Sequence, residues 1–137
     1  KDSVFYIGIQ ILGGMLASQT HVALFGRMHS FGVTTLSVDV GQGFFLEAFC
    51  TGLLMFVILQ VTRKENNIYG IAIGGTVFIS ALLIGEYTGG SLNPARSIGP
   101  ALVSGKTREI YFYVLAPVIG SLISSKLFTT KFSKNSK

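Results

Sequence analysis

The sequence predicts an all-α membrane protein made of four transmembrane helices and one helix of about half their length. Hydrophobic residues make up 49% of the 137 residues and charged residues only 12%, a balance typical of membrane proteins rather than of soluble domains. Four apolar runs are long enough to cross a hydrocarbon core of ~30 Å as helices. These runs are residues 4–25, 42–62, 69–86 and 110–128, whereas a fifth run at 95–103 is too short.

The first run, residues 4–25, carries a face of small residues formed by Gly13, Gly14 and Ala17. Small residues on one face of a membrane helix let another helix approach closely. We therefore expect this face to pack against a second helix. The mixed loop at 26–41 then leads to the next run.

The second run, residues 42–62, contains a single charged residue, Glu47. A carboxylate inside a membrane is costly, so it marks a functional site and needs a partner. One interpretation is a structural acceptor of hydrogen bonds. The other is a proton relay, against which no second buried acid or histidine chain is visible in the sequence.

The third and last runs, residues 69–86 and 110–128, complete the set of expected spans. Gly70, Gly74 and Gly75 are spaced along the third run so that another helix could approach closely. The last run begins with aromatic residues, which suit the interface between membrane and water.

The short run is preceded by signals for the start of a helix. Asn93 is a good N-cap, because its side chain can accept a bond from a free amide of the first turn. Pro94 then occupies the first helical position, where a missing N–H costs little. About eleven helical residues rise roughly 16 Å, half of a ~30 Å core. Such a half-helix survives at membrane depth only where it lines a cavity or is buried in protein.

Residues 89–96, Gly-Gly-Ser-Leu-Asn-Pro-Ala-Arg, resemble the second Asn-Pro-Ala box of the aquaporin family, the major intrinsic proteins. The resemblance implies a right-handed helical bundle built from two similar halves, each with three spans and one half-helix. Residues 1–137 would then be a single aquaporin-like membrane domain, comprising the last span of the first half and the whole second half. The rest of the first half would be missing, which agrees with a first residue, Lys1, that is not methionine. The complete protein would be a homotetramer in the lipid bilayer.

The resemblance also assigns roles around the box Asn93, Pro94 and Ala95. The amide of Asn93 would be the central donor of a water pore, beside a helix N-terminus that carries roughly +0.5 of an elementary charge. Arg96, which cannot deprotonate, would be a permanent positive charge at the outer constriction, although an arginine reaching toward the interface is the alternative. Glu47 would accept hydrogen bonds from the loop before the half-helix. The carbonyls that line the pore would be those of Gly89, Gly90, Ser91 and Leu92.

The residues at the expected constriction indicate two classes of solute. Gly90 and Ala81 match two further positions of the family's constriction, and Leu54 and Val77 match its apolar pore wall. Water-selective members typically have a histidine where Ala81 stands, so the gate could be wider and could pass glycerol, urea or other small neutral solutes. Ser97, Ala101 and Tyr113 instead resemble water channels. We expect water to pass, with the glycerol-type channel as the alternative.

Other classes of function fit the sequence less well. A truncated family member that conducts nothing remains an alternative, because half of the channel would be absent. A transporter with a broken helix would need a coupling carboxylate near the break, and only Glu47 and Glu86 are candidates. No nucleophile–base pair exists for an enzyme, so no catalytic residue is expected. His21 and His29 have no cysteine or carboxylate at ligand spacing, so neither metal nor cofactor is expected.

The charge distribution predicts orientation rather than a nucleic-acid partner. The net charge is +5, but no basic stripe interleaved with aromatic residues exists. The positive-inside rule places the more basic loops in the cytoplasm. One side of the expected membrane protein, which includes the C-terminus, carries Lys1, Arg63, Lys64, Lys126, Lys131, Lys134 and Lys137, and the other carries only Arg27, Lys106 and Arg108. We therefore expect a multi-pass protein with a cytoplasmic C-terminus.

Overall fold

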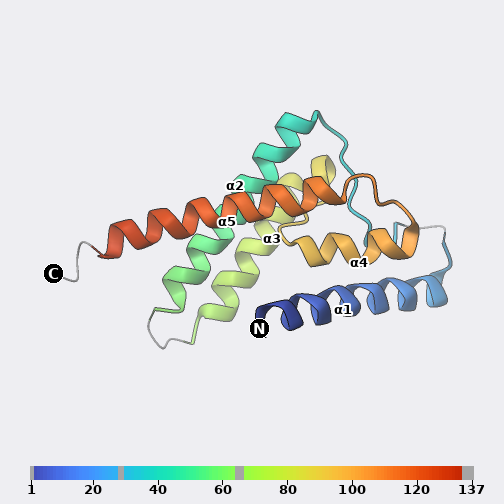
Figure 1. Cartoon of the computed structure of the whole chain (residues 1–137), viewed down its shortest axis with the longest axis horizontal. Helices are drawn as coiled ribbons and strands as arrows, with labels where there is room; N and C mark the ends of the chain where they lie inside the picture. The colour runs from blue at the N-terminus through green and yellow to red at the C-terminus, as the bar shows by residue number, and fades with distance from the viewer. Residues whose placement is uncertain (1, 28–29, 64–66, 134–137) are drawn as a thin grey trace.

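The protein is built from five α-helices, as the computed structural model shows for residues 2–27, 30–63 and 67–133 (Figure 1). No strand occurs within these described residues, and the predicted all-α class is confirmed. Four lysines used for the orientation, and His29, lie outside them. The helices are α1 (Asp2–Phe25), α2 (Val40–Val61), α3 (Tyr69–Thr88), α4 (Pro94–Ser104) and α5 (Ile110–Ser133).

Four of these helices, α1, α2, α3 and α5, are long and apolar enough to span a membrane. Their outer surfaces are rich in exposed apolar side chains, and Ile71 on α3 keeps 79% of its surface exposed. Exposed apolar patches of this size on a soluble monomer would be exceptional. They are the expected surface of helices that face lipid.

Helix α2 packs against both α3 and α5, and α4 joins this group to α1. α2 and α3 run side by side, and α5 crosses α2 (Figure 1). α4 lies between α5 and α1, and α4 is the only described helix against which α1 packs (Figure 1). The half-helix is therefore covered on two sides, as required for a short helix at membrane depth.

Glycines form the two closest helix crossings. A Cβ placed on Gly99 of α4 would lie 2.7 Å from the carbonyl carbon of Gly14 on α1. Gly120 of α5 meets the backbone of Ala48 on α2 in the same way. The predicted small-residue face of α1 thus does pack against a helix through Gly14, whereas a Cβ on Gly13 would have nothing within 4 Å.

The expected close approach at the glycines of α3 is wrong for this chain. A Cβ placed on Gly70, Gly74 or Gly75 would meet no atom of the described residues within 4 Å. The reason is that α3 packs against α2 alone among the described helices, and its glycines lie away from that contact.

Candidate functional site

The N-terminus of α4 has the capped geometry that its sequence predicts. Asn93 is extended, with φ −152° and ψ 120°, and its Oδ1 accepts a hydrogen bond from the Ala95 N–H at 2.9 Å. Pro94 is the first helical residue. Because the amide oxygen of Asn93 is held by the backbone, its amide nitrogen is oriented away from the helix, and it makes no hydrogen bond to the residues that the structure describes. The helix ends at Ser104, followed by Gly105 in the left-handed region.

Residues 89–92, which lie between the end of α3 and Asn93, form a sharply folded segment. Gly89 and Gly90 have φ values of +77° and +58°, which glycine adopts without strain. Leu92 has φ +56°, which is uncommon for a residue with a side chain and is unfavourable by order 1–3 kcal/mol. Something must therefore hold this segment in place.

Glu47 holds it. The side chain is completely buried, with 0% of its surface exposed. Its Oε1 accepts from the Ser91 N–H at 2.7 Å and from the Thr88 hydroxyl at 2.7 Å, and its Oε2 accepts from the Leu92 N–H at 2.9 Å. These bonds confirm the expected contact with the loop before the half-helix. Two of the three donors are backbone amides, which do not relay protons, so the geometry favours a structural carboxylate over a proton relay.

Thr88 extends this anchoring to α5. Its hydroxyl, which donates to Glu47, also accepts from the Gly90 N–H at 3.2 Å. Its carbonyl accepts from the hydroxyl of Tyr113 at 2.7 Å. Tyr113 is itself buried. The folded segment is thereby attached to α2, the end of α3 and α5 together.

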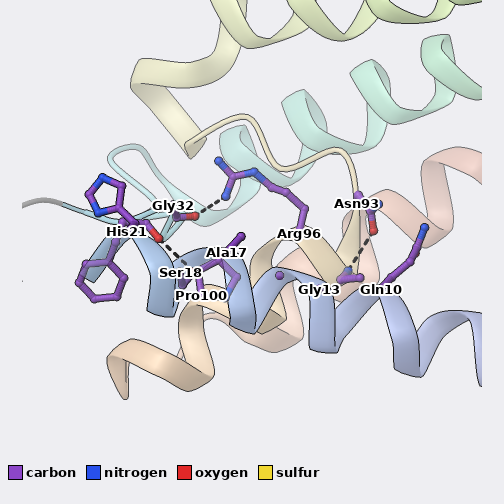
Figure 2. A pocket seen from close by; sticks show the side chains of 12 residues that line it. Gln10, Gly13, Ala17, Ser18, His21, Gly32, Asn93, Arg96 and Pro100 are labelled. Carbon is purple, nitrogen blue, oxygen red and sulfur yellow. Dashed lines mark hydrogen bonds between the residues drawn. The ribbon is translucent and has the colours of Figure 1, made fainter. Parts of the chain in front are cut away.

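Two cavities meet at the start of α4, and both Asn93 and Arg96 line both of them. The first has a volume of about 560 Å³ and lies between α1, the loop at Phe31 and Gly32, and α4 (Figure 2). The second has a volume of about 440 Å³ and lies between α2, α3, α5 and the folded segment. Its lining includes Leu54, Val77, Ser91, Leu92 and Pro94.

The Arg96 guanidinium reaches the loop before α2, where its Nη1 donates to the carbonyl of Gly32 (Figure 2). Figure 2 shows Asn93 and Arg96 projecting from the same end of α4. The arginine is therefore tied to a backbone acceptor beside a cavity. This contact is unlike that of a side chain that extends freely to an interface.

Ala81 and Gly90 are neighbours, as the resemblance implies, but they border neither cavity. A Cβ placed on Gly90 would lie 3.5 Å from the Cα of Ala81 and 3.9 Å from its Cβ. The side chain of Ala81 is exposed on the surface of this chain. Gly89 borders neither cavity either, whereas the last two residues of the expected carbonyl ladder, Ser91 and Leu92, border the second one.

The sequence did not reveal that residues 30–39 fold over the site. Four hydrogen bonds attach this loop to α3, to α4 and to Glu109, the residue directly before α5. They join Gly32 O to Arg96, Thr34 Oγ1 to Ser97 Oγ at 2.8 Å, Leu36 N to Glu109 Oε2 at 3.1 Å, and Ser37 N to Tyr87 O at 2.8 Å. The one available signal was a pair of threonines in a glycine-containing loop, which does not say which helix they contact.

Comparison with known proteins places the chain in context. Residues 1–128 match the family model described as Major intrinsic protein. Aquaporin NIP6-1 of Arabidopsis thaliana is 38% identical over 132 residues, which cover 94% of this chain and 43% of the plant protein. Nodulin-26 of Glycine max is 40% identical over 127 residues, which cover 90% of this chain and 47% of nodulin-26. The chain thus spans less than half the length of these two relatives.

A solved structure has the same fold. The X-ray structure of the aquaglyceroporin from Plasmodium falciparum matches 90% of this chain and 61% of its own chain, with a TM-score of 0.70 and 24% sequence identity. Agreement at this level of identity concerns the fold alone, and it confirms the aquaporin-like bundle. Together with the four apolar helices, these matches make the protein a multi-pass integral membrane protein.

Proposed function

We propose that this chain, which belongs to the major intrinsic protein family, forms one half of the wall of a channel that passes water by passive diffusion. The family is one of channels and not of enzymes, so no residue is assigned a catalytic role. The observation that carries the proposal is the half-helix α4, whose capped N-terminus presents Asn93 and Arg96 to two adjoining cavities.

The chemistry of this end of α4 suits water. The amide nitrogen of Asn93 offers donors at the centre, and the carbonyls of Ser91 and Leu92, with those of Gly89 and Gly90 before them, offer acceptors. The N-terminus of α4 and the charge of Arg96 oppose cations and hydrated protons, because both are positive. Leu54 and Val77 supply an apolar wall at the second cavity. This wall offers no hydrogen bonds that would retain a passing water molecule.

The remaining parts of the proposal concern the whole protein. Residues 1–137 act as a single aquaporin-like domain, and a counterpart half with its own Asn-Pro-Ala box faces Asn93 and Arg96 across the pore. The protein assembles as a homotetramer, and its C-terminus lies in the cytoplasm. The relatives are more than twice as long as the matched region, which supports a counterpart half.

A second solute class is favoured by one observation. Ala81 and Gly90 lie against each other with almost no side chain between them. A small polyol or urea needs such space beside a donor, and Arg96 supplies donors. The alternative function is therefore a channel that also passes glycerol, urea or other small neutral solutes. If neither water nor these solutes pass, the chain belongs to a family member that conducts nothing.

The test is stopped-flow light scattering on vesicles that contain the natural full-length protein. We expect osmotic shrinkage much faster than that of empty vesicles, while a pH-sensitive dye inside the vesicles shows no added proton flux. Addition of glycerol or urea in place of an impermeant osmolyte separates the two solute classes. Shrinkage no faster than that of empty vesicles would support the non-conducting alternative.

A further inference from the structure

Three buried hydroxyl groups form a continuous chain behind the start of α4. The Thr34 hydroxyl donates to the Ser97 Oγ at 2.8 Å, and the Ser97 and Ser91 hydroxyls lie 2.6 Å apart. The Ser91 hydroxyl donates to the carbonyl of Asn93 at 3.0 Å. Thr34, Ser91 and Ser97 keep only 6%, 4% and 1% of their surfaces exposed. A polar chain this deeply buried is worth more when every link is made than any one pair suggests.

The direction of the protons in this chain follows from counting. Each hydroxyl has one proton to donate. Ser91 uses its proton on the Asn93 carbonyl, so Ser97 must donate to Ser91 across the 2.6 Å contact. The chain therefore runs from Thr34 through Ser97 and Ser91 to Asn93, and the hydroxyl of Thr34 is its first donor. If that donor is removed, the buried Ser97 Oγ loses the hydrogen bond that it accepts.

Thr34 belongs to the loop, not to α4, so the chain attaches the loop to the half-helix. Its backbone is also close to the folded segment, because a Cβ placed on Gly89 would lie 2.9 Å from the Cα of Thr34. Two residues before Thr34, the carbonyl of Gly32 holds the guanidinium of Arg96 (Figure 2). The position of that carbonyl thus depends on the anchor that follows it.

We propose that Thr34 is a positioning residue that determines solute size selectivity, because its hydroxyl fixes the loop carbonyl that holds Arg96. The inference rests on the proposed function, in which Arg96 stands beside the permeating solute. Ala81 and Gly90 provide almost no bulk near the folded segment, so the width on this side depends on where Arg96 is held. Loss of the anchor lets the carbonyl of Gly32 and the guanidinium move together, which widens the passage.

The experiment compares variants of the natural full-length protein in vesicles by stopped-flow light scattering with water and with glycerol. Thr34→Val keeps the shape of the side chain and removes the donor. We expect its glycerol-to-water permeability ratio to rise roughly two- to fivefold, since one lost hydrogen bond shifts an equilibrium about fivefold. Thr34→Ser keeps the donor and should restore the ratio of the parent. Thr35→Val changes the exposed neighbour in the same loop and should leave the ratio unchanged.

Ser97→Ala provides an independent variant, because it removes the acceptor of the same bond from α4. We expect it to raise the ratio in the same direction, and it decides the question if Thr34→Val is not recovered from the membrane. A parent that passes water while Thr34→Val or Ser97→Ala keeps its ratio would overturn this inference alone. A parent no faster than empty vesicles would overturn the proposed function and this inference with it.

Discussion

The carboxylate of Glu47 on α2 holds Ser91, which lies 44 residues later in the chain, through a 2.7 Å hydrogen bond to its backbone N–H. The same carboxylate accepts from the next amide, that of Leu92, whose backbone has a positive φ. One buried charge therefore stabilises the unusual turn that brings the chain to Asn93. The half-helix keeps its place at membrane depth because α2 reaches it through this side chain.

Replacement of Glu47 should loosen this turn. Glu47→Gln keeps one acceptor oxygen but loses the charge, and we expect it to destabilise the protein by about 2 kcal/mol, since bonds to charged groups contribute ~1.5–3 kcal/mol. Glu47→Ala should be worse, because the amides of Ser91 and Leu92 are left buried without an acceptor. Thermal unfolding in detergent micelles, together with water flux in vesicles, measures both effects.

Glu86→Gln is the matched control, because it removes an exposed carboxylate from α3. It should leave stability and flux unchanged. The role assigned to Glu47 is wrong if both of its variants assemble and conduct as the parent does.

Gly99→Ala should separate α4 from α1. The added methyl carbon would lie 2.7 Å from the carbonyl carbon of Gly14 and 2.8 Å from the amide nitrogen of Met15, and backbone atoms cannot move aside as a flexible side chain can. We expect a loss of ~1–3 kcal/mol from overpacking, measured as a lower unfolding temperature in micelles. Gly74→Ala places the same methyl group in open space and should be neutral or stabilising by up to ~1 kcal/mol. Equal behaviour of the two variants would contradict the described crossing.

Ala81→His should narrow the passage. The ring would stand beside Gly90, where the structure has almost no side chain. We expect water flux to persist and the flux of glycerol and urea to fall, as measured by stopped-flow light scattering on the natural full-length protein. If the parent already excludes both solutes, Ala81 does not widen the gate, and the counterpart half governs selectivity.

Residues 1–137 alone in vesicles should not conduct. Asn93 and Arg96 are both exposed within this chain, and an uncovered arginine at membrane depth costs at least ~2.5 kcal/mol. Osmotic swelling of vesicles that hold only this chain measures the expectation. A rate above that of bare lipid would show that the chain, or an assembly of its copies, closes a pore by itself.

Hydropathy predicts which segments are helical, but local chemistry sets their ends. The fourth span continues to Ser133, past the expected residue 128, because polar residues near the end of a membrane helix do not stop it. α2 starts at Val40, where Asp39 caps it by accepting from the Gly41 N–H at 2.8 Å. α3 ends at Thr88 because Gly89 takes a left-handed conformation.

The part of the site around Glu47 was predictable, because burying a charged side chain in an apolar segment is energetically unfavourable. A buried acid in an apolar run requires donors, so the contact of Glu47 with the folded segment could be predicted. The anchoring of the loop through Thr34 could not, because an irregular polar loop has no periodicity that indicates which helix it covers. The glycines of α3 were also mispredicted, because their spacing alone does not indicate which face of the helix packs against another helix.

Water flux through variants of neighbouring leucines on α2 tests the central claim most directly. Leu54 lines the second cavity together with Asn93 and Arg96, whereas Leu53 lines neither described cavity and keeps 44% of its surface exposed. In stopped-flow light scattering on the natural full-length protein, we predict that Leu54→Trp fills the passage and brings shrinkage close to the rate of empty vesicles. Leu53→Trp should conduct as the parent does. A parent no faster than empty vesicles, or a Leu54→Trp variant as fast as Leu53→Trp, would contradict a water path along α2 and the start of α4.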